Sequence, residues 1–153
     1  QFYHRRICWL ATQEYGKAVA DAAHTLGLMD YCARHSDDEE WIHTHEQYRP
    51  FVMYHRMQAH AMSKLVDNAP EEAVQSINGG LKKVRRLYEK HDLLEEFDQD
   101  ELVARLIELR ESLRDQFEVG RTLHEQLSDA VASEEYELAA RIRDKLQNRR
   151  KMR

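Results

Sequence analysis

Apolar residues recur at steps of three and four along most of this chain, which is the spacing of one face of an α-helix. Only five glycines and two prolines occur among 153 residues, and charged residues make up a third of the sequence. This balance predicts long helices and no sheets. The length suits one domain, or one compact domain with an appendage. We therefore expect an all-α fold built from antiparallel helical hairpins.

Changes in composition divide the chain into three parts. Residues 1–91 have the pattern of successive helical hairpins. Residues 92–120 begin with an acidic link, in which Phe97 is expected to point inward, and continue as a long helix. Residues 121–153 form a further hairpin with a basic tail.

Helical spacing begins close to the first residue. The positions that share one face of the first segment are Tyr3, Ile7, Leu10 and Ala11. Gln13 and Glu14 then allow two interpretations, a turn between two helices or the middle of one helix that runs to Arg34. The sequence starts inside this helical pattern and without Met, so we expect an upstream portion to exist.

Caps and prolines mark the next boundaries. Ser36 or Asp37 is suited to cap a helix whose first turn carries the acids that follow. Pro50 fixes its own φ and lacks an N–H donor, so we expect a break or kink just before it. Pro70 fits the first turn of a helix that follows a stop at residues 67–68.

Glycines have two expected roles. Gly79 and Gly80 lie within a helical pattern, which indicates close contact with a neighbouring helix. A regular stripe from Leu102 to Ala130 predicts one long helix that continues directly into the terminal hairpin. Gly120 is the expected flexible point of that helix, because glycine costs about 1 kcal/mol relative to alanine inside a helix.

The stretch from Leu123 to Leu146 contains two short helical stripes separated by a polar turn. In the turn, Ser133 offers a hydroxyl cap, and the two acids that follow suit the positive end of a second helix. A hairpin of this size is too short to bury its own apolar face, so it should dock on something else.

An uncommon string of residues defines this stretch further. It comprises Leu123, Leu127, Ala130-Val131, the turn Glu134-Glu135-Tyr136-Glu137, and then Ala139-Ala140-Arg141-Ile142-Arg143-Asp144-Lys145-Leu146. The string resembles the UVR domain, the helical hairpin of the B and C subunits of bacterial nucleotide-excision nuclease, which also occurs in adaptors and activators of Clp-type proteases. The resemblance implies a module for protein contacts with no catalytic centre.

The same resemblance implies a contact face for a protein partner or for self-association. Its expected residues are Leu123, Leu127, Ala130, Tyr136, Ala139, Ala140, Arg143 and Leu146. The partner would be a second copy of the hairpin, a nucleotide-excision subunit, or a Clp-type unfoldase or kinase. The adaptors' zinc-binding cysteine pairs and the excision subunits' helicase or nuclease domains do not occur in this sequence, so neither pathway is carried over.

The segment from Met62 to Leu81 resembles a tetratricopeptide-type unit. The resemblance rests on Ala59, Ala61, the link Asn68-Ala69-Pro70 and Glu71-Glu72-Ala73-Val74. The full pattern of Trp, Gly and Pro positions of that repeat is absent. The resemblance therefore implies stacked helical hairpins of this general kind for residues 1–91.

The remaining polar residues predict no catalysis, cofactor or metal site. Metal-binding histidine pairs on a helix need a spacing of four, whereas residues 43 and 45 are two apart and residues 55 and 60 are five apart. His4 and Cys8 have the spacing but no third ligand near them. Neither a Gly-rich phosphate loop nor a nucleophile elbow occurs. We expect a protein that is not an enzyme.

Two further features concern compartment and charge. Cys8 and Cys32 have no paired spacing and fit reduced thiols in the cytosol. No apolar run approaches membrane-spanning length. We therefore expect a cytoplasmic protein without membrane contact. The formal net charge of −5 argues against a general nucleic-acid-binding surface.

Arginines concentrate at two places. Arg49 and Arg56 lie among aromatic residues around Pro50, where an internal latch to an acid is favoured over an anion- or peptide-binding spot. The C-terminal cations are Arg149, Arg150, Lys151 and Arg153. They suit the negative end of a helix. A weak nucleic-acid contact without sequence preference, as in a DNA-repair accessory factor, is the alternative.

Overall fold

The computed structural model describes residues 2–151, apart from the side chain of residue 150. Within these residues the chain forms helices and no strand, which confirms the all-α prediction. The helices are α1 (Phe2–Ala11), α2 (Tyr15–His35), α3 (Glu39–Glu46), α4 (Arg49–Val66), α5 (Pro70–Lys90), α6 (Leu94–Phe97), α7 (Glu101–Phe117), α8 (Leu123–Ala132) and α9 (Tyr136–Lys151).

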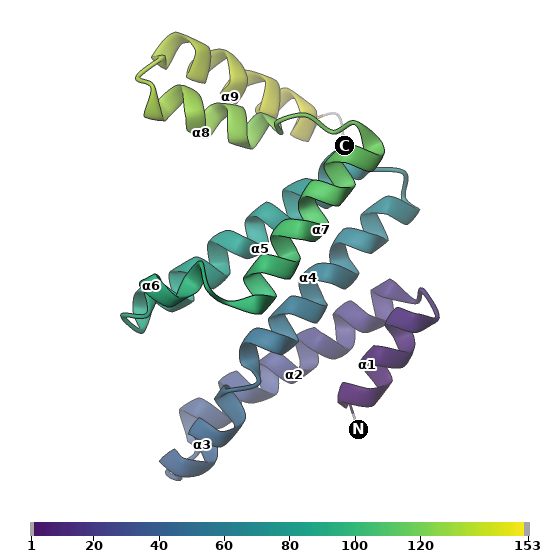
Figure 1. Ribbon diagram of the computed structural model, residues 1–153, viewed down its shortest axis with the longest axis vertical. Coiled ribbons are helices and arrows are strands. Elements are labelled where there is room, and N and C mark those ends of the chain that lie inside the picture. Colours follow the sequence, from purple (N-terminus) through teal and green to yellow (C-terminus); the bar gives the residue numbers. More distant parts are fainter. Residues whose placement is uncertain (1, 152–153) are drawn as a thin grey trace.

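The long helices of the body pack as a row of neighbours. Helix α1 packs on α2, α2 on α4, α4 on α5, and α5 on α7. The last two helices, α8 and α9, pack on each other and form a separate layer beyond the ends of α5 and α7 (Figure 1). The hairpin of α8 and α9 therefore lies at the opposite end of the molecule from α3.

The first boundary is a turn. Helix α1 ends at Ala11 and α2 begins at Tyr15, and Gln13 between them has a left-handed φ of 60°. A residue in this conformation ends a helix, because it cannot continue the right-handed hydrogen-bond ladder. The turn interpretation is confirmed and the uninterrupted helix is excluded.

The face predicted for α1 is wrong. Tyr3 and Ile7 are 47% and 37% exposed, whereas Arg6 is 1% exposed and is the buried residue of this helix. Polar contacts explain this orientation of α1. Arg5 and Trp9 donate hydrogen bonds to Asp21 of α2, and Arg6 donates one to His55 of α4. These bonds turn the arginine side of α1 inward.

The proline boundaries are confirmed, and one cap is corrected. Pro50 and Pro70 each lie in the first turn of a helix, α4 and α5. The cap of α3 is Asp38, whose Oδ1 accepts from the backbone N–H of Trp41 at 2.9 Å. Ser36 instead ends α2 as its C-cap. Asp38 takes the role because it directly precedes the first helical residue.

The larger core lies between α4, α5 and α7. Its buried residues are Ala61, Ala73, Val74, Ile77, Leu81, Val84, Phe97, Val103, Leu106 and Leu113. The inward position predicted for Phe97 is confirmed, and its ring meets that of Tyr88 edge-on with centroids 5.7 Å apart. A Cβ added to Gly80 would lie 1.9 Å from Sδ of Met57, which confirms close helix contact at that glycine.

The prediction of one helix running through residues 102–130 is wrong. Helix α7 ends at Phe117, Glu118 is left-handed with a φ of 52°, and α8 begins only at Leu123. Gly120 lies in this non-helical link. The break occurs because Thr122 caps a new helix with its hydroxyl, an interaction that the apolar stripe does not reveal.

Candidate functional site

The C-terminal hairpin consists of two antiparallel helices joined by a tight turn. Ser133 is the C-cap of α8, with its N–H bonded to the carbonyl of Asp129 at 2.8 Å. Glu134 has a left-handed φ of 59°, and α9 starts at Tyr136. The role predicted for Ser133 as the opening cap of the second helix is therefore wrong, because this residue still belongs to the end of the first.

The hairpin has a small apolar core of its own. Ala130, Ala139 and Ile142 are each less than 5% exposed. Leu123, Leu127 and Leu146 pack against them partly buried. The expectation that the hairpin is too short to bury its own apolar face is corrected in part, because Ala130 and Ala139 let the two helices close on each other around Ile142, while the leucines at 123, 127 and 146 stay only partly buried.

The residues predicted to contact a partner separate into two groups. The inner group faces the other helix of the hairpin and comprises Leu123, Leu127, Ala130, Ala139 and Leu146. The outer group is exposed on α9 and comprises Tyr136, Ala140 and Arg143. The predicted contact face combined Arg143 with Ala139 and Leu146, but Arg143 is exposed and Ile142 is the residue that is buried with them.

Three large apolar side chains lie exposed beside the turn. Val131 ends α8 and is 47% exposed, while Tyr136 and Leu138 begin α9 and are 67% and 45% exposed. We refer to Val131, Tyr136 and Leu138 as the hairpin tip. The turn points away from the body (Figure 1). Of these residues only Tyr136 was predicted to contact a partner. Apolar residues on both sides of an acidic turn were the available signal for the other two.

The other end of the hairpin is held to the body at Thr122. This residue is 2% exposed, and its Oγ1 donates to Oε1 of Gln75 on α5 at 2.8 Å. Thr122 also forms a capping box with Glu125: its N–H donates to Oε2 of Glu125 at 2.8 Å, and its Oγ1 accepts from the N–H of Glu125 at 3.3 Å. The same hydroxyl thus starts α8 and fixes it to α5.

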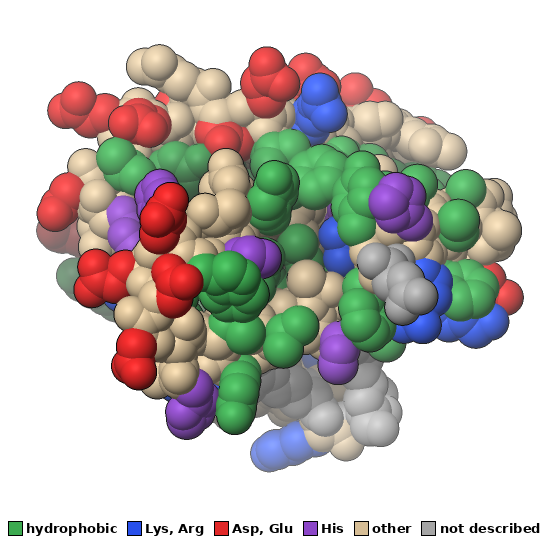
Figure 2. Space-filling model, turned by 90° about the horizontal axis from the view of Figure 1, so that it is seen from below, with side chains coloured by type: hydrophobic (Ala, Val, Ile, Leu, Met, Phe, Trp, Pro, Cys, Tyr) green, Lys and Arg blue, Asp and Glu red, His purple; other side chains and the backbone are tan. Residues whose placement is uncertain are grey.

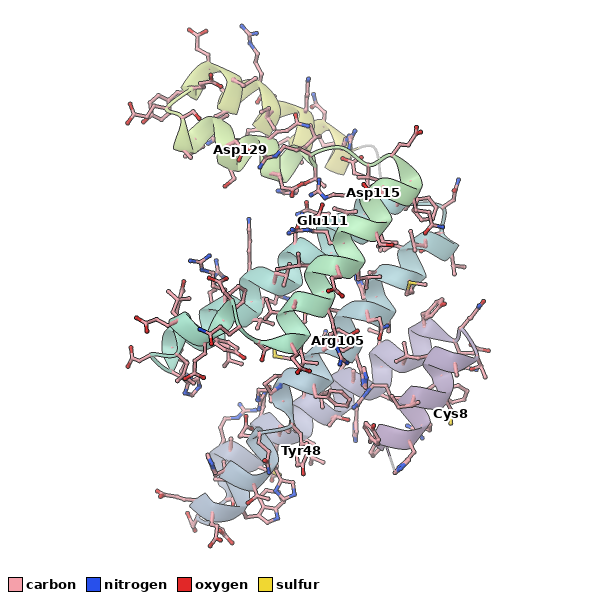
Figure 3. The ribbon with its side chains drawn as sticks, in the orientation of Figure 1. Cys8, Tyr48, Arg105, Glu111, Asp115 and Asp129 are labelled. Atoms are coloured by element: carbon pink, nitrogen blue, oxygen red, sulfur yellow. The ribbon has the colours of Figure 1, made fainter. Side chains whose placement is uncertain are left out.

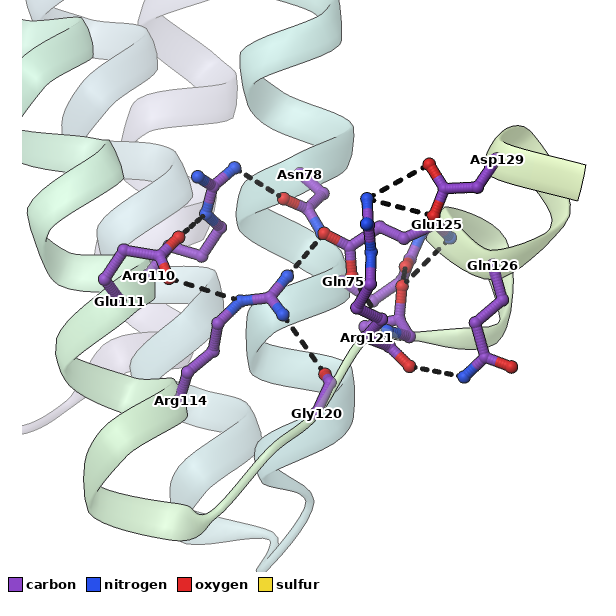
Figure 4. Close-up of polar contacts among 11 residues, drawn as sticks. Gln75, Asn78, Arg110, Glu111, Arg114, Gly120, Arg121, Glu125, Gln126 and Asp129 are labelled. Atoms are coloured by element: carbon purple, nitrogen blue, oxygen red, sulfur yellow. Dashed lines mark hydrogen bonds and ion pairs between the residues drawn. The ribbon is translucent and has the colours of Figure 1, made fainter. Parts of the chain in front are cut away.

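Arg114 of α7 adds a charged contact at this junction (Figure 4). Its Nη2 pairs with Oε1 of Glu125, and its Nη1 donates to the carbonyl of Gly120 at 3.2 Å. Burial raises the pKa of the Glu125 carboxyl, but hydrogen bonds with Thr122 and the charge of Arg114 outweigh it and lower the pKa overall. Glu111 and Asp115 on the same helix lie on the side of the molecule that carries the hairpin (Figure 3).

The basic tail also contacts the body. Nη1 of Arg149 lies 3.0 and 3.1 Å from the two carboxylate oxygens of Glu71, in the first turn of α5. Lys151 is exposed. The side chain of Arg150 and all of Arg153 lie outside the described residues.

The arginines near Pro50 differ from each other. Arg49 is bonded to Glu46 through Nε at 2.5 Å and Nη2 at 2.7 Å, and its Nη1 lies 2.8 Å from Oδ1 of Asp30 on α2. These bonds raise the pKa of the guanidinium, chiefly through Glu46. The arrangement is that of an internal latch between α2 and the α3–α4 junction. Arg56 is exposed.

Other chemistry is sparse in the described part of the chain. No group of three His, Cys, Asp or Glu side chains in residues 2–151 has the geometry to hold a metal ion. Cys8 and Cys32 are free thiols, and Cys8 lies on the outer side of α1 (Figure 3). None of the described helices combines the length and the apolar character needed to cross a membrane.

Residues 121–151, which form the C-terminal hairpin, match the family model described as the UvrB/uvrC motif. The C-terminal hairpin is a UVR motif. This match confirms the resemblance and spans α8, α9 and the two link residues before them. The UVR motif occurs in DNA-repair proteins and mediates protein interactions. Searches of the curated proteins and of the solved structures gave no match. The tetratricopeptide-like character of residues 1–91 stays a prediction.

Proposed function

We propose that this protein is a non-catalytic interaction protein that binds another protein through its C-terminal UVR hairpin. The observation that carries the proposal is the hairpin tip. Val131, Tyr136 and Leu138 expose apolar surface at the point furthest from the body, on a motif that mediates protein contacts elsewhere. Exposed apolar groups gathered at one place are typical of interaction sites.

The two groups of predicted contact residues then have different roles. Tyr136, Ala140 and Arg143 are spaced by four and three, so they form a stripe along the outer face of α9. The small side chain of Ala140 leaves room for a partner helix between the larger two. The inner residues, such as Leu127 and Ala139, act indirectly, because they hold α8 and α9 together.

The experiment compares self-association and capture of partner proteins by the full chain and by a tip variant. Replacing Tyr136 and Leu138 with Asp places charge where a partner must bury apolar surface. We expect loss of concentration-dependent association in light scattering, or loss of specifically captured proteins, with unchanged helical circular dichroism. Tyr31→Asp on α2 is the matched control, because Tyr31 is 58% exposed and far from the hairpin in sequence and fold. Equal association by all three proteins would refute the proposal.

A second candidate function is that of an accessory factor in nucleotide-excision repair with weak nucleic-acid contact through the tail. The UVR motif and the cations of α9 favour it. The ion pair of Arg149 with Glu71 disfavours it, because one of the tail cations is already neutralised. Fluorescence anisotropy with labelled duplex and single-stranded DNA tests it, and absence of binding at low salt would eliminate it.

We also propose a bacterial, cytoplasmic setting for this protein. The free thiols of Cys8 and Cys32 support a reducing compartment. Fractionation of the native host, followed by detection with an antibody, tests the location.

A further inference from the structure

Helices α1, α2 and α4, with Tyr48 just before α4, line a half-open cavity of about 610 Å³ at the end of the molecule remote from the hairpin. Its walls are mainly aromatic or apolar: Tyr3, Met29, Tyr48, Phe51 and Val52. Arg6 and Thr25 complete the lining. Figure 2 views this end of the molecule, where hydrophobic side chains gather over the middle of the surface and acidic residues lie mainly towards its edges. A volume of this size is typical of small-molecule sites.

The guanidinium of Arg6 is buried beside this cavity and has no hydrogen bond to an acidic side chain among the described residues. Arg6 is 1% exposed, its Nε donates to Nδ1 of His55 at 3.2 Å, and its Nη1 has no hydrogen-bond partner among the described residues. Asp21 is the acid whose charge acts on Arg6. Its oxygens are instead bonded to Arg5 at 2.5 and 2.6 Å and to Trp9 at 3.1 Å.

His55 does not compensate this charge. Burial, and then the charge of Arg6, lower the pKa of His55 to about 4, so its imidazole is neutral at pH 7 and its Nδ1 accepts from Arg6. Burial also lowers the pKa of Arg6, but a guanidinium stays protonated in proteins. Asp21 carries one negative charge for the two guanidiniums of Arg5 and Arg6, so this site keeps a net positive charge. Burying such a charge is unfavourable, and an anion that enters the cavity would offset it.

We propose that this cavity binds a small ligand with one carboxylate on an aromatic or aliphatic body, and that the carboxylate pairs with Arg6. A single negative charge fits, because Arg6 is the one cationic residue among the described residues that line the cavity. The apolar body packs against the walls, which include the rings of Tyr3 and Phe51. The centroids of these two rings lie 5.9 Å apart, and the centroid of Phe51 lies 4.3 Å from that of the His55 ring. A phosphate dianion fits less well, since it needs more donors than one guanidinium supplies.

The test measures binding of matched probes to the full chain at pH 7 by calorimetry and by NMR of the His55 ring. The probes are 3-phenylpropanoate, the neutral 3-phenylpropanamide and inorganic phosphate. We expect saturable binding of the carboxylate at least tenfold tighter than that of the amide, with a shift of the His55 resonances. We expect phosphate to leave these resonances unchanged. Binding of the amide as tight as that of the carboxylate would overturn the proposal.

Variants identify Arg6 as the anion-binding group. Arg6→Gln removes the buried charge and should weaken carboxylate binding at least tenfold while leaving amide binding unchanged. Arg56→Gln is the matched control, because Arg56 is exposed on α4. Arg6→Lys keeps a cation without the planar fork and should retain part of the carboxylate affinity. Carboxylate binding that Arg6→Gln does not weaken would overturn the proposal, as would absence of any carboxylate binding to the unmodified chain.

Discussion

The imidazole of His55 is neutral because of where α4 places it. Burial and the neighbouring charge of Arg6 lower its pKa from an ordinary value of 6.5 to about 4. The unfolded chain therefore takes up this proton at a higher pH than the folded protein does. The stabilisation that results is fully present above about pH 6.5 and is lost as the pH falls towards 4.

This linkage predicts an acid sensitivity that a single variant removes. At about 1.4 kcal/mol per pH unit, the lowered pKa of His55 predicts a loss of about 2–2.5 kcal/mol between pH 7 and pH 4.5. His55→Asn keeps an acceptor for Arg6 but does not titrate. Urea unfolding at the two pH values should show a smaller loss for the variant by that amount. Equal losses of stability in the variant and in the unmodified protein would mean that His55 does not cause the acid sensitivity.

The adjacent glycines of α5 provide a matched pair of substitutions. A Cβ at Gly80 would collide with Sδ of Met57, whereas a Cβ at Gly79 meets nothing within 4 Å. Gly79→Ala should stabilise by about 0.5–1 kcal/mol, because alanine favours the helix. Gly80→Ala should be less stable than Gly79→Ala by about 1–3 kcal/mol, the usual cost of overpacking. Thermal unfolding of both variants checks this difference, and equal stabilities would show that Met57 moves aside freely.

The sequence predicted the position of single residues correctly where a local property of the residue decides that position. Pro50 and Pro70 start helices whatever surrounds them, and the Gly79-Gly80 pair indicated a helix contact. It failed for Arg6, because periodicity assigns a charged residue to the solvent side. Only the distant partner His55 on α4, which no local pattern reveals, places this arginine inside.

At the scale of elements, the link between α7 and α8 is fixed by polar contacts rather than by apolar packing. Arg114 connects the end of α7 with both the link carbonyl of Gly120 and the carboxylate of Glu125. Because the pKa of Glu125 is lowered, this pair persists until the pH falls below the ordinary value of 4.5. The orientation of the hairpin thus depends on a few side chains.

Removal of Arg114 should loosen the start of the hairpin. Arg114→Ala leaves Glu125 partly buried without its cation, and we expect about 1–2 kcal/mol of destabilisation. Amide hydrogen exchange should be several-fold faster in the first turn of α8. Arg105→Ala is the control, because Arg105 is exposed and lies 3.7 Å from an exposed Glu101, so the change should be below about 0.5 kcal/mol. Unchanged exchange in α8 would show that the capping box suffices.

Apolar periodicity in the sequence predicted most of the helices, but it did not predict the break between α7 and α8. The stripe from Leu102 to Ala130 continues in register across the break, so spacing alone favoured one helix. The signal that opposed it was Thr122 with Glu125 three residues later, a capping-box pattern. In α9, the predicted contact face included Arg143, whereas the structure buries its neighbour Ile142, because an apolar side chain is favoured inside the hairpin.

At the scale of the whole molecule, the body and the hairpin have separate apolar cores. The core of the hairpin contains Ala130, Ala139 and Ile142, and none of these belongs to the clusters of the body. The contacts described between the two parts are polar and involve Thr122, Glu125 and Arg149. Neither part requires apolar contact with the other to bury its core.

A chain that ends at residue 120 should therefore fold. We expect retention of the cooperative unfolding of the body, with a loss of about 1–3 kcal/mol because Gln75, Glu71 and Arg114 lose hydrogen-bonding partners. The separate peptide 121–151 should be only partly helical, since a core of three residues does not offset the entropy of ordering two short helices. Circular dichroism with denaturant unfolding of both pieces measures this. An unfolded or aggregated chain 1–120 would show instead that the hairpin completes the core of the body.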